Sequence, residues 1–164
     1  MPETYEEYLD WVSELGSRLE KVPPEFKNKR MCFAALQHNK YNINLVPSEM
    51  KSPELLLEAF HKYNLPIEYL PEELLTHEIC MIEMCRDPSN LYSIPEKLRT
   101  RKICLEAVKR RGSMLEYVPK KLHKPALCLE AIKEYPGAAK YVHHELITRA
   151  LKNLQEENTN AQTI

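Results

Sequence analysis

Glycine is scarce in this chain of 164 residues, which holds three glycines against twelve prolines. So few glycines leave little material for the loops that cradle phosphate groups. Long apolar runs and a surplus of basic charge are also missing, since the formal net charge is −1. The composition therefore excludes a transmembrane helix and a protein that is cationic as a whole.

Signal-peptide and catalytic signatures are absent as well. The opening stretch, MPETYEEYLDWVSELG, is acidic where a secretory signal peptide is basic and then apolar. No H-E-x-x-H, G-x-S-x-G or dinucleotide-binding fingerprint occurs. We therefore expect a protein that folds in a cytoplasm, is not an enzyme and uses no cofactor.

Five of the prolines recur every 24 residues, and each follows an aliphatic residue. They are Pro23, Pro47, Pro71, Pro95 and Pro119. The next step falls on Val142 and His143, so the period continues where the proline is lost. A fixed period of this length is typical of stacked structural units.

Each period carries the pattern of one long helix. Residues that can cap a helix N-terminus recur at one position. They are Asn28, Ser52, Thr76, Thr100 and Thr148, with Lys124 as the exception. Four apolar columns follow, represented in the first of these helices by Met31, Cys32, Ala35 and Leu36, and their spacing gives one buried helical face. The helix is expected to end near Asn64, Pro88, Gly112 and Pro136, and one or two short helical turns should precede each proline.

The predicted fold is all-α, an α-solenoid of about six 24-residue helical repeats with capped ends, because one such repeat cannot bury its own apolar face. We expect a single domain over residues 1–154. Its repeats lie near 1–22, 23–46, 47–70, 71–94, 95–118 and 119–142, with a C-terminal cap at 143–154. Residues 155–164 lack periodic apolar residues and are expected to form a disordered polar tail.

Cysteines could suggest a metal site, but their positions favour packing. Four of the five, Cys32, Cys80, Cys104 and Cys128, share one column, in which Leu56 takes the remaining place. Exchange with leucine is typical of a small buried hydrophobe. The string His77, Cys80 and Cys85 lacks the four converging ligands of a zinc site, so we expect no metal.

Charge is distributed unevenly along the chain. Residues 95–124 contain ten Lys or Arg against three Glu, whereas acidic residues dominate residues 1–25. Two interpretations stay open: mixed charge that keeps the protein in solution, or a patch that steers an acidic partner. The candidate binding residues are Arg99, Arg101, Lys102, Lys109, Arg110, Arg111, Lys120 and Lys121, together with Tyr63 and Tyr135, which end long helices.

The stretch LRTRKICLEAVKRRGSMLEYVPKKL, residues 98–122, resembles the helical repeats of the family named domain of unknown function 4116. The T-x-x-[IL]-C-[LM]-x-A core, the Gly or Pro stop and the EYVP close support the resemblance, which covers about residues 20–150. The family is similar to proteins of bacteria that live with eukaryotic cells, including secreted effectors. The resemblance implies no catalytic residue.

The sequence thus predicts a non-enzymatic protein-binding scaffold whose partner has an acidic surface. The resemblance adds the expectation of a bacterial effector that acts on a host protein and reaches the host cell without a cleavable signal peptide. The alternative is binding of nucleic acid or another phosphate polymer through residues 95–124. No membrane span is expected, and the oligomeric state is left open.

Overall fold

The computed structural model describes residues 2–143, 145, 146 and 148. Over these residues every regular element is helical and no strand occurs, which confirms the all-α class. The chain divides into two compact units, an N-terminal unit up to Leu74 and a C-terminal unit from Leu75, which we describe separately. The single domain over 1–154 stays a prediction. The expected tail at 155–164 and most of the expected cap at 143–154 lie outside the described residues.

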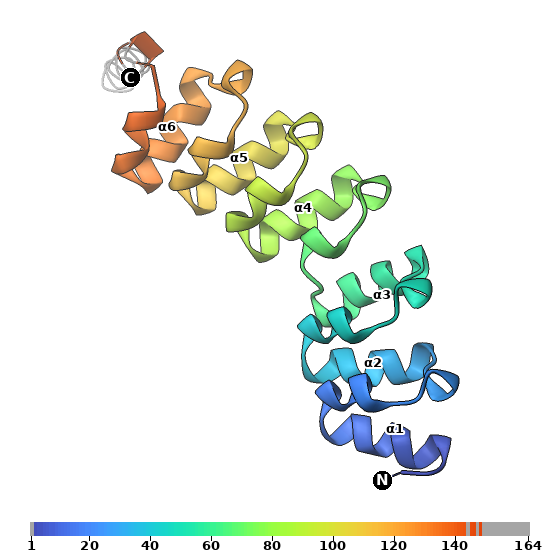
Figure 1. Ribbon diagram of the computed structural model, residues 1–164. Coiled ribbons are helices and arrows are strands. Elements are labelled where there is room, and N and C mark those ends of the chain that lie inside the picture. Colours follow the sequence, from blue (N-terminus) through green and yellow to red (C-terminus); the bar gives the residue numbers. More distant parts are fainter. Residues whose placement is uncertain (1, 144, 147, 149–164) are drawn as a thin grey trace, which may run out of the picture. The chain divides into compact units, whose positions relative to one another are not determined.

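Long α-helices begin at 24-residue intervals throughout the described part of the chain. In the N-terminal unit they are α1 (Tyr5–Glu14), α2 (Lys29–His38) and α3 (Pro53–Tyr63). In the C-terminal unit they are α4 (His77–Arg86), α5 (Arg101–Arg110) and α6 (Pro125–Glu134). Within each unit these helices lie side by side, as Figure 1 shows.

N-cap side chains decide where these helices begin. The predicted caps are confirmed at Asn28, Ser52, Thr76 and Thr100, where each side-chain oxygen accepts the backbone N–H three residues later. Lys124 makes no such bond, and Pro125 takes the first helical position, where no N–H is needed. Sequence reasoning overlooked Thr4, which stands one period before Asn28 and forms a capping box with Glu7.

Short 3₁₀-helices fill the rest of each period. Six-residue helices follow five of the long helices: η1 (Gly16–Lys21), η3 (Lys40–Leu45), η7 (Pro88–Ser93), η9 (Gly112–Tyr117) and η11 (Pro136–Tyr141). Three-residue helices follow the periodic proline: η2 (Pro24–Phe26), η4 (Ser48–Met50), η6 (Glu72–Leu74), η8 (Glu96–Leu98) and η10 (Lys120–Leu122). The exception comes after α3, where only η5 (Ile67–Tyr69) forms.

In the N-terminal unit the long helices pack in sequence, α1 on α2 and α2 on α3, and η1 lies against both α2 and η3. The core contains the predicted apolar columns, including Met31, Leu36 and Phe60, none of which is more than 2% exposed. Burying a side chain of this size stabilises the fold by roughly 1.5–3 kcal/mol. Polar side chains of the 3₁₀-helices satisfy backbone carbonyls of the preceding long helix: Arg18 donates to Trp11 O at 3.0 Å and Asn42 donates to Ala35 O at 2.8 Å.

The C-terminal unit repeats this arrangement. Helix α4 packs on α5 and α5 on α6, while η9 contacts both η7 and η11. Asn90, two periods after Asn42, donates to Glu83 Oε1 at 2.6 Å. Glu83 is 3% exposed and stands where the other periods from Ala35 onward carry alanine, a position that sequence reasoning left out.

Two glycines at equivalent positions bring the start of a 3₁₀-helix close to the next long helix. A Cβ atom on Gly16 would lie 2.5 Å from Ala35 O, and one on Gly112 would overlap Ala131 O. Ala35 and Ala131 are themselves equivalent, since both belong to the small-residue column. The missing side chain therefore sets how closely successive periods approach in each unit.

None of the described helices is both long enough and apolar enough to span a bilayer.

Candidate binding surfaces

Four of the predicted binding cations face solvent without an internal partner. Arg101 and Lys102 open α5, Lys109 lies near its end, and Lys121 lies in η10. All four are exposed, and across the described residues none of them forms a hydrogen bond or ion pair. Their charges are therefore available to a partner.

Arg99 is used inside the fold. Its guanidinium donates to Ile94 O at 2.7 Å, to Tyr117 O at 2.7 Å and to Tyr92 O at 3.1 Å. A planar fork of donors suits three converging carbonyls. Arg99 thus joins the ends of η7 and η9. Its main role is to hold these two 3₁₀-helices in position, and contact with a partner comes second.

Arg110 and Arg111 also reach back by about one period. Arg110 Nη1 donates to the carbonyl oxygens of Met84, at 3.2 Å, and of Cys85, which end α4 without an intrahelical donor. Arg111 Nη1 donates to Ser89 Oγ at 2.6 Å. Both arginines remain exposed, so part of each guanidinium still meets solvent.

The two candidate tyrosines differ. Tyr63 is half-buried, and its ring centroid lies 5.6 Å from that of Phe33, one helix earlier. Tyr135 is 45% exposed at the end of α6. Tyr135 therefore offers more of its surface to a contact than Tyr63 does.

Another tyrosine position ties successive periods together. Tyr69 Oη accepts from Asn44 Nδ2 at 3.2 Å, and Tyr141, three periods after Tyr69, donates its Oη–H to Glu116 Oε2 at 2.8 Å; each tyrosine lies 25 residues after its partner. At the intermediate place the ring of Tyr117 lies 5.9 Å from the ring of Tyr92. This tyrosine column is mainly structural: Tyr69 and Tyr141 are half-buried, although Tyr117 is 37% exposed.

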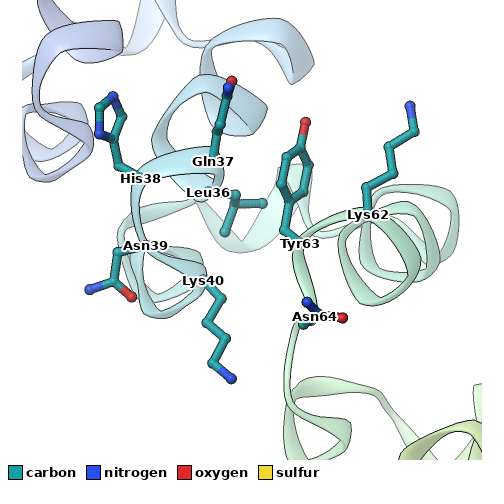
Figure 2. A pocket seen from close by; sticks show the side chains of 8 residues that line it. All are labelled: Leu36, Gln37, His38, Asn39, Lys40, Lys62, Tyr63 and Asn64. Atoms are coloured by element: carbon teal, nitrogen blue, oxygen red, sulfur yellow. The ribbon is translucent and has the colours of Figure 1, made fainter. Parts of the chain in front are cut away.

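A cleft of about 700 Å³ opens in the N-terminal unit between the ends of α2 and α3. Figure 2 shows the side chains of Leu36 to Lys40 along one wall and those of Lys62, Tyr63 and Asn64 along the other. Lys62 turns away to pair with Glu58 at 2.7 Å. Asn64 closes α3 in the left-handed region, at φ 54. The wall chemistry mixes cations, amides and helix-end carbonyls, so it selects no single ligand class.

Two cavities in the C-terminal unit form a matched pair. One, of about 500 Å³, is lined by Glu96, Arg99, Glu116, Tyr117, Val118, Pro119, Lys120 and Lys121. The other, of about 480 Å³, is lined by Lys120, His123, Lys140, Tyr141, Val142, His143 and Leu146. Six of these positions recur 24 residues later in the second cavity. The cavities are therefore the same feature seen in two successive periods.

His123 joins the second cavity to the backbone. It stands one period after Arg99, is 7% exposed, and places Nε2 3.1 Å from Val118 O, as Arg99 Nε approaches Ile94 O. Burial lowers the pKa of His123, and the nearby Lys120 lowers it further. At neutral pH the imidazole is uncharged and donates to the carbonyl.

The cysteine prediction is confirmed for the shared column: Cys32, Cys80, Cys104 and Cys128 are free and at most 1% exposed, whereas Cys85 is exposed. Burial raises the pKa of Cys32 and of Cys104 to about 11, and it also raises the pKa of Cys80 and Cys128. A thiol with a raised pKa is a poor nucleophile at neutral pH. No group of three or more His, Cys, Asp or Glu within the described residues is arranged to hold a metal ion.

Residues 78–123 match the family model described as Domain of unknown function (DUF4116). This segment resembles that family. The match lies within the C-terminal unit and inside the wider span, residues 20–150, over which the sequence resemblance was expected. It includes α5, every residue that lines the first cavity and most of the basic segment 95–124. No curated protein and no solved structure matches the chain.

Proposed function

We propose that the chain is a non-enzymatic protein-binding scaffold, an α-solenoid of about six 24-residue helical repeats whose partner has an acidic surface. One face of each long helix packs against its neighbours, and the opposite face is open to solvent. The observation that supports an acidic partner is the set of exposed cations without internal partners, Arg101, Lys102, Lys109 and Lys121. They lie beside arginines that the fold uses internally, so the surplus of charge is not needed for stability.

Charge of one sign on such a surface raises the rate and selectivity of encounter more than the affinity itself. We therefore expect salt to weaken capture, mainly through slower association. The five free thiols suit a reducing compartment, which supports a cytoplasmic location. A bacterial effector that acts on a host protein is a narrower form of this proposal, and it rests on the family resemblance alone.

The test compares two variants of equal charge change. Lys102→Glu with Lys109→Glu reverses the α5 surface, whereas Lys21→Glu with Arg30→Glu reverses two exposed cations of the N-terminal unit. Proteins captured by the unmodified chain and by the second variant, but lost by the first, would be purified and their binding measured at increasing salt. Identical capture by all three chains would remove the proposal that α5 carries recognition.

Nucleic-acid binding is the second candidate, because residues 95–124 hold ten Lys or Arg against three Glu. Neutralising several phosphates predicts that affinity for duplex or single-stranded DNA falls by about 10³-fold or more between about 50 mM and about 200 mM salt. A filter-binding series over this range decides it. Weak binding without that steep dependence would leave the protein-binding proposal as the only one of the two.

A further inference from the structure

The paired cavities of the C-terminal unit share more than their position. Each is walled on one side by a proline-turn 3₁₀-helix, η8 or η10, and on the other by the end of the next six-residue helix, η9 or η11. Each contains the periodic tyrosine, Tyr117 or Tyr141, and the buried valine beside it. Since η9 contacts η11, the two openings are neighbours on one unit.

Lysines surround both openings. Lys121 lines the first cavity and Lys140 lines the second, while Lys120 lines both. Lys120 Nζ lies 3.3 Å from Tyr141 O and remains exposed, so its ammonium group stands at the shared wall. Across both linings the acids are Glu96 and Glu116, and Glu116 already accepts a hydrogen bond from Tyr141. The surface is therefore positive where the two cavities meet.

Spacing restricts what can occupy both cavities at once. Packed helices lie about 10 Å apart, so equivalent points of successive periods are separated by about that distance. A peptide in the polyproline II conformation advances about 3.1 Å per residue with about three residues per turn, so three residues cover one period and side chains three residues apart face the same way. A peptide that follows this line would present one side chain to each cavity at every third residue.

We propose that the two cavities bind one extended acidic segment of a partner protein, with an Asp or Glu carboxylate near Lys121 in the first cavity and another, three residues later, near Lys140 in the second. This inference rests on the proposed function and specifies its site. Charge-assisted hydrogen bonds from lysine to carboxylate supply the attraction, and the tyrosine rings supply apolar contact for the residues between.

The linings favour a peptide over a nucleic acid. A nucleic-acid strand carries a phosphate at every nucleotide and cannot avoid Glu96 and Glu116 in the first cavity. A peptide can place uncharged or basic side chains beside these two carboxylates and its acids beside the lysines. The backbone N–H groups of the peptide can also donate hydrogen bonds to the two glutamate carboxylates.

The experiment uses the full chain and two fluorescent peptides of about twelve residues. In one peptide a glutamate occupies every third position with serine and threonine between; the other has the same composition with the glutamates contiguous. We expect the evenly spaced peptide to bind more tightly by about fivefold or more at low salt. The variant Lys121→Glu with Lys140→Glu should weaken its binding by about tenfold or more. Lys21→Glu with Arg30→Glu is the matched control, expected to stay within about twofold.

Each outcome has one meaning. Equal affinity for the two peptides, or a larger loss in Lys102→Glu with Lys109→Glu than in the cavity variant, would overturn the cavity assignment and leave the proposed acidic-partner function standing. Failure of both peptides to bind at low salt would count against the proposed function as well. Tighter binding of single-stranded DNA of equal charge than of the spaced peptide would overturn the inference in favour of nucleic acid. Far-UV circular dichroism of each variant verifies that exposed substitutions leave the fold intact.

Discussion

The junction between α2 and α3 in the N-terminal unit and the junction between α4 and α5 in the C-terminal unit use equivalent positions, yet one is open and the other is bridged. At the second, Arg110 donates to the carbonyls of Met84 and Cys85. At the first, the equivalent residue is Lys62, which pairs with Glu58 instead, and a cleft of about 700 Å³ remains. The residue at this position of the period thus contributes to whether the ends of successive helices are joined.

Other junctions show that the bridge need not be an arginine. His38, at the position of Arg110, contacts the carbonyl of Ser13, and Glu134 at the same position accepts from the N–H of Gly112. The ends of two successive helices can therefore be joined in two ways. A side chain of the later helix contacts a carbonyl near the end of the earlier helix, or it accepts a hydrogen bond from the N–H that begins the following 3₁₀-helix. Helix α3 is also one residue longer than the other long helices, and its left-handed cap at Asn64 delays the next helix. The backbone and the side chain at Lys62 therefore both contribute to the open cleft.

The largest expected effect comes from filling the close approach at the glycines. Gly112→Val would force a Cβ into the carbonyl of Ala131, and we expect it to lower the free energy of unfolding by about 3 kcal/mol or more. Gly16→Val should cost a similar amount at the equivalent place in the N-terminal unit. Gly137→Ala is the control, because its Cβ would meet only the movable ring of Tyr135. Urea denaturation measures the stability of all three variants. An unchanged free energy of unfolding in Gly112→Val would show that the close approach of Gly112 to Ala131 is not required.

Alkaline pH should destabilise the two units to different extents. Burial raises the pKa of Cys32 in the N-terminal unit and of Cys80, Cys104 and Cys128 in the C-terminal unit. The folded thiols keep their protons above the pH at which unfolded thiols lose them, so stability is complete below about pH 8.5 and falls as the pH rises toward 11. A thiol whose pKa is about 11 contributes about 2–3 kcal/mol of this loss.

With three buried thiols of raised pKa against one, the C-terminal unit should unfold first as the pH rises. Fluorescence of the chain's one tryptophan, Trp11, reports on the N-terminal unit, and far-UV circular dichroism reports on both. We expect the urea midpoint measured by circular dichroism to fall more steeply with pH than the midpoint measured by fluorescence. Cys104→Ala should flatten that dependence; a parallel fall of both midpoints would contradict the prediction.

Removing the bridge should have a moderate effect. Arg110→Met keeps the length of the side chain but loses the donors to the α4 carbonyls, and because the site is exposed we expect a loss of about 1–2 kcal/mol. Lys62→Met at the equivalent place breaks only an exposed ion pair and should cost about 0.5 kcal/mol or less. Thermal unfolding of the two variants compares the junctions directly. Equal losses would mean that Arg110 does not act as a bridge.

The smallest expected effect would sharpen the comparison most. Lys62→Arg brings a guanidinium toward the carbonyls of Leu36 and Gln37, which stand where Met84 and Cys85 stand in the C-terminal unit. We expect a gain of about 0.5 kcal/mol in the free energy of unfolding. No gain would assign the open cleft to the backbone around Asn64 alone. Chemical denaturation with several repeats resolves a difference of this size.

Sequence reasoning succeeded where the controlling interaction is local. A cap such as Ser52 bonds three residues ahead within its own turn, and the exchange of Cys32 for Leu56 in one column already indicates burial. The same rule would have identified Thr4, since it stands in the cap column and Glu7 completes the capping box.

The roles of the cations could not be predicted in this way. Arg99 and Arg110 look like Arg101 in the sequence, and their difference arises from contacts 18 to 26 residues away along the chain. Those contacts depend on how closely successive helices approach, which no local pattern encodes. The cavities escaped notice for a related reason, because their walls are formed by turns of two periods, whose spacing only the folded chain defines.

Folding keeps the four buried sulfur atoms in four different long helices. Within the C-terminal unit, neighbouring helices hold Cys80, Cys104 and Cys128 about 10 Å apart, beyond the about 7 Å between Cα atoms that a disulfide tolerates. An unfolded chain has no such separation, so in an oxidising medium its thiols can join in mismatched pairs that lock wrong loops covalently. A reductant keeps those thiols free while the chain folds. The arrangement of sulfur along the helices therefore makes refolding of the chain sensitive to the redox state of the medium.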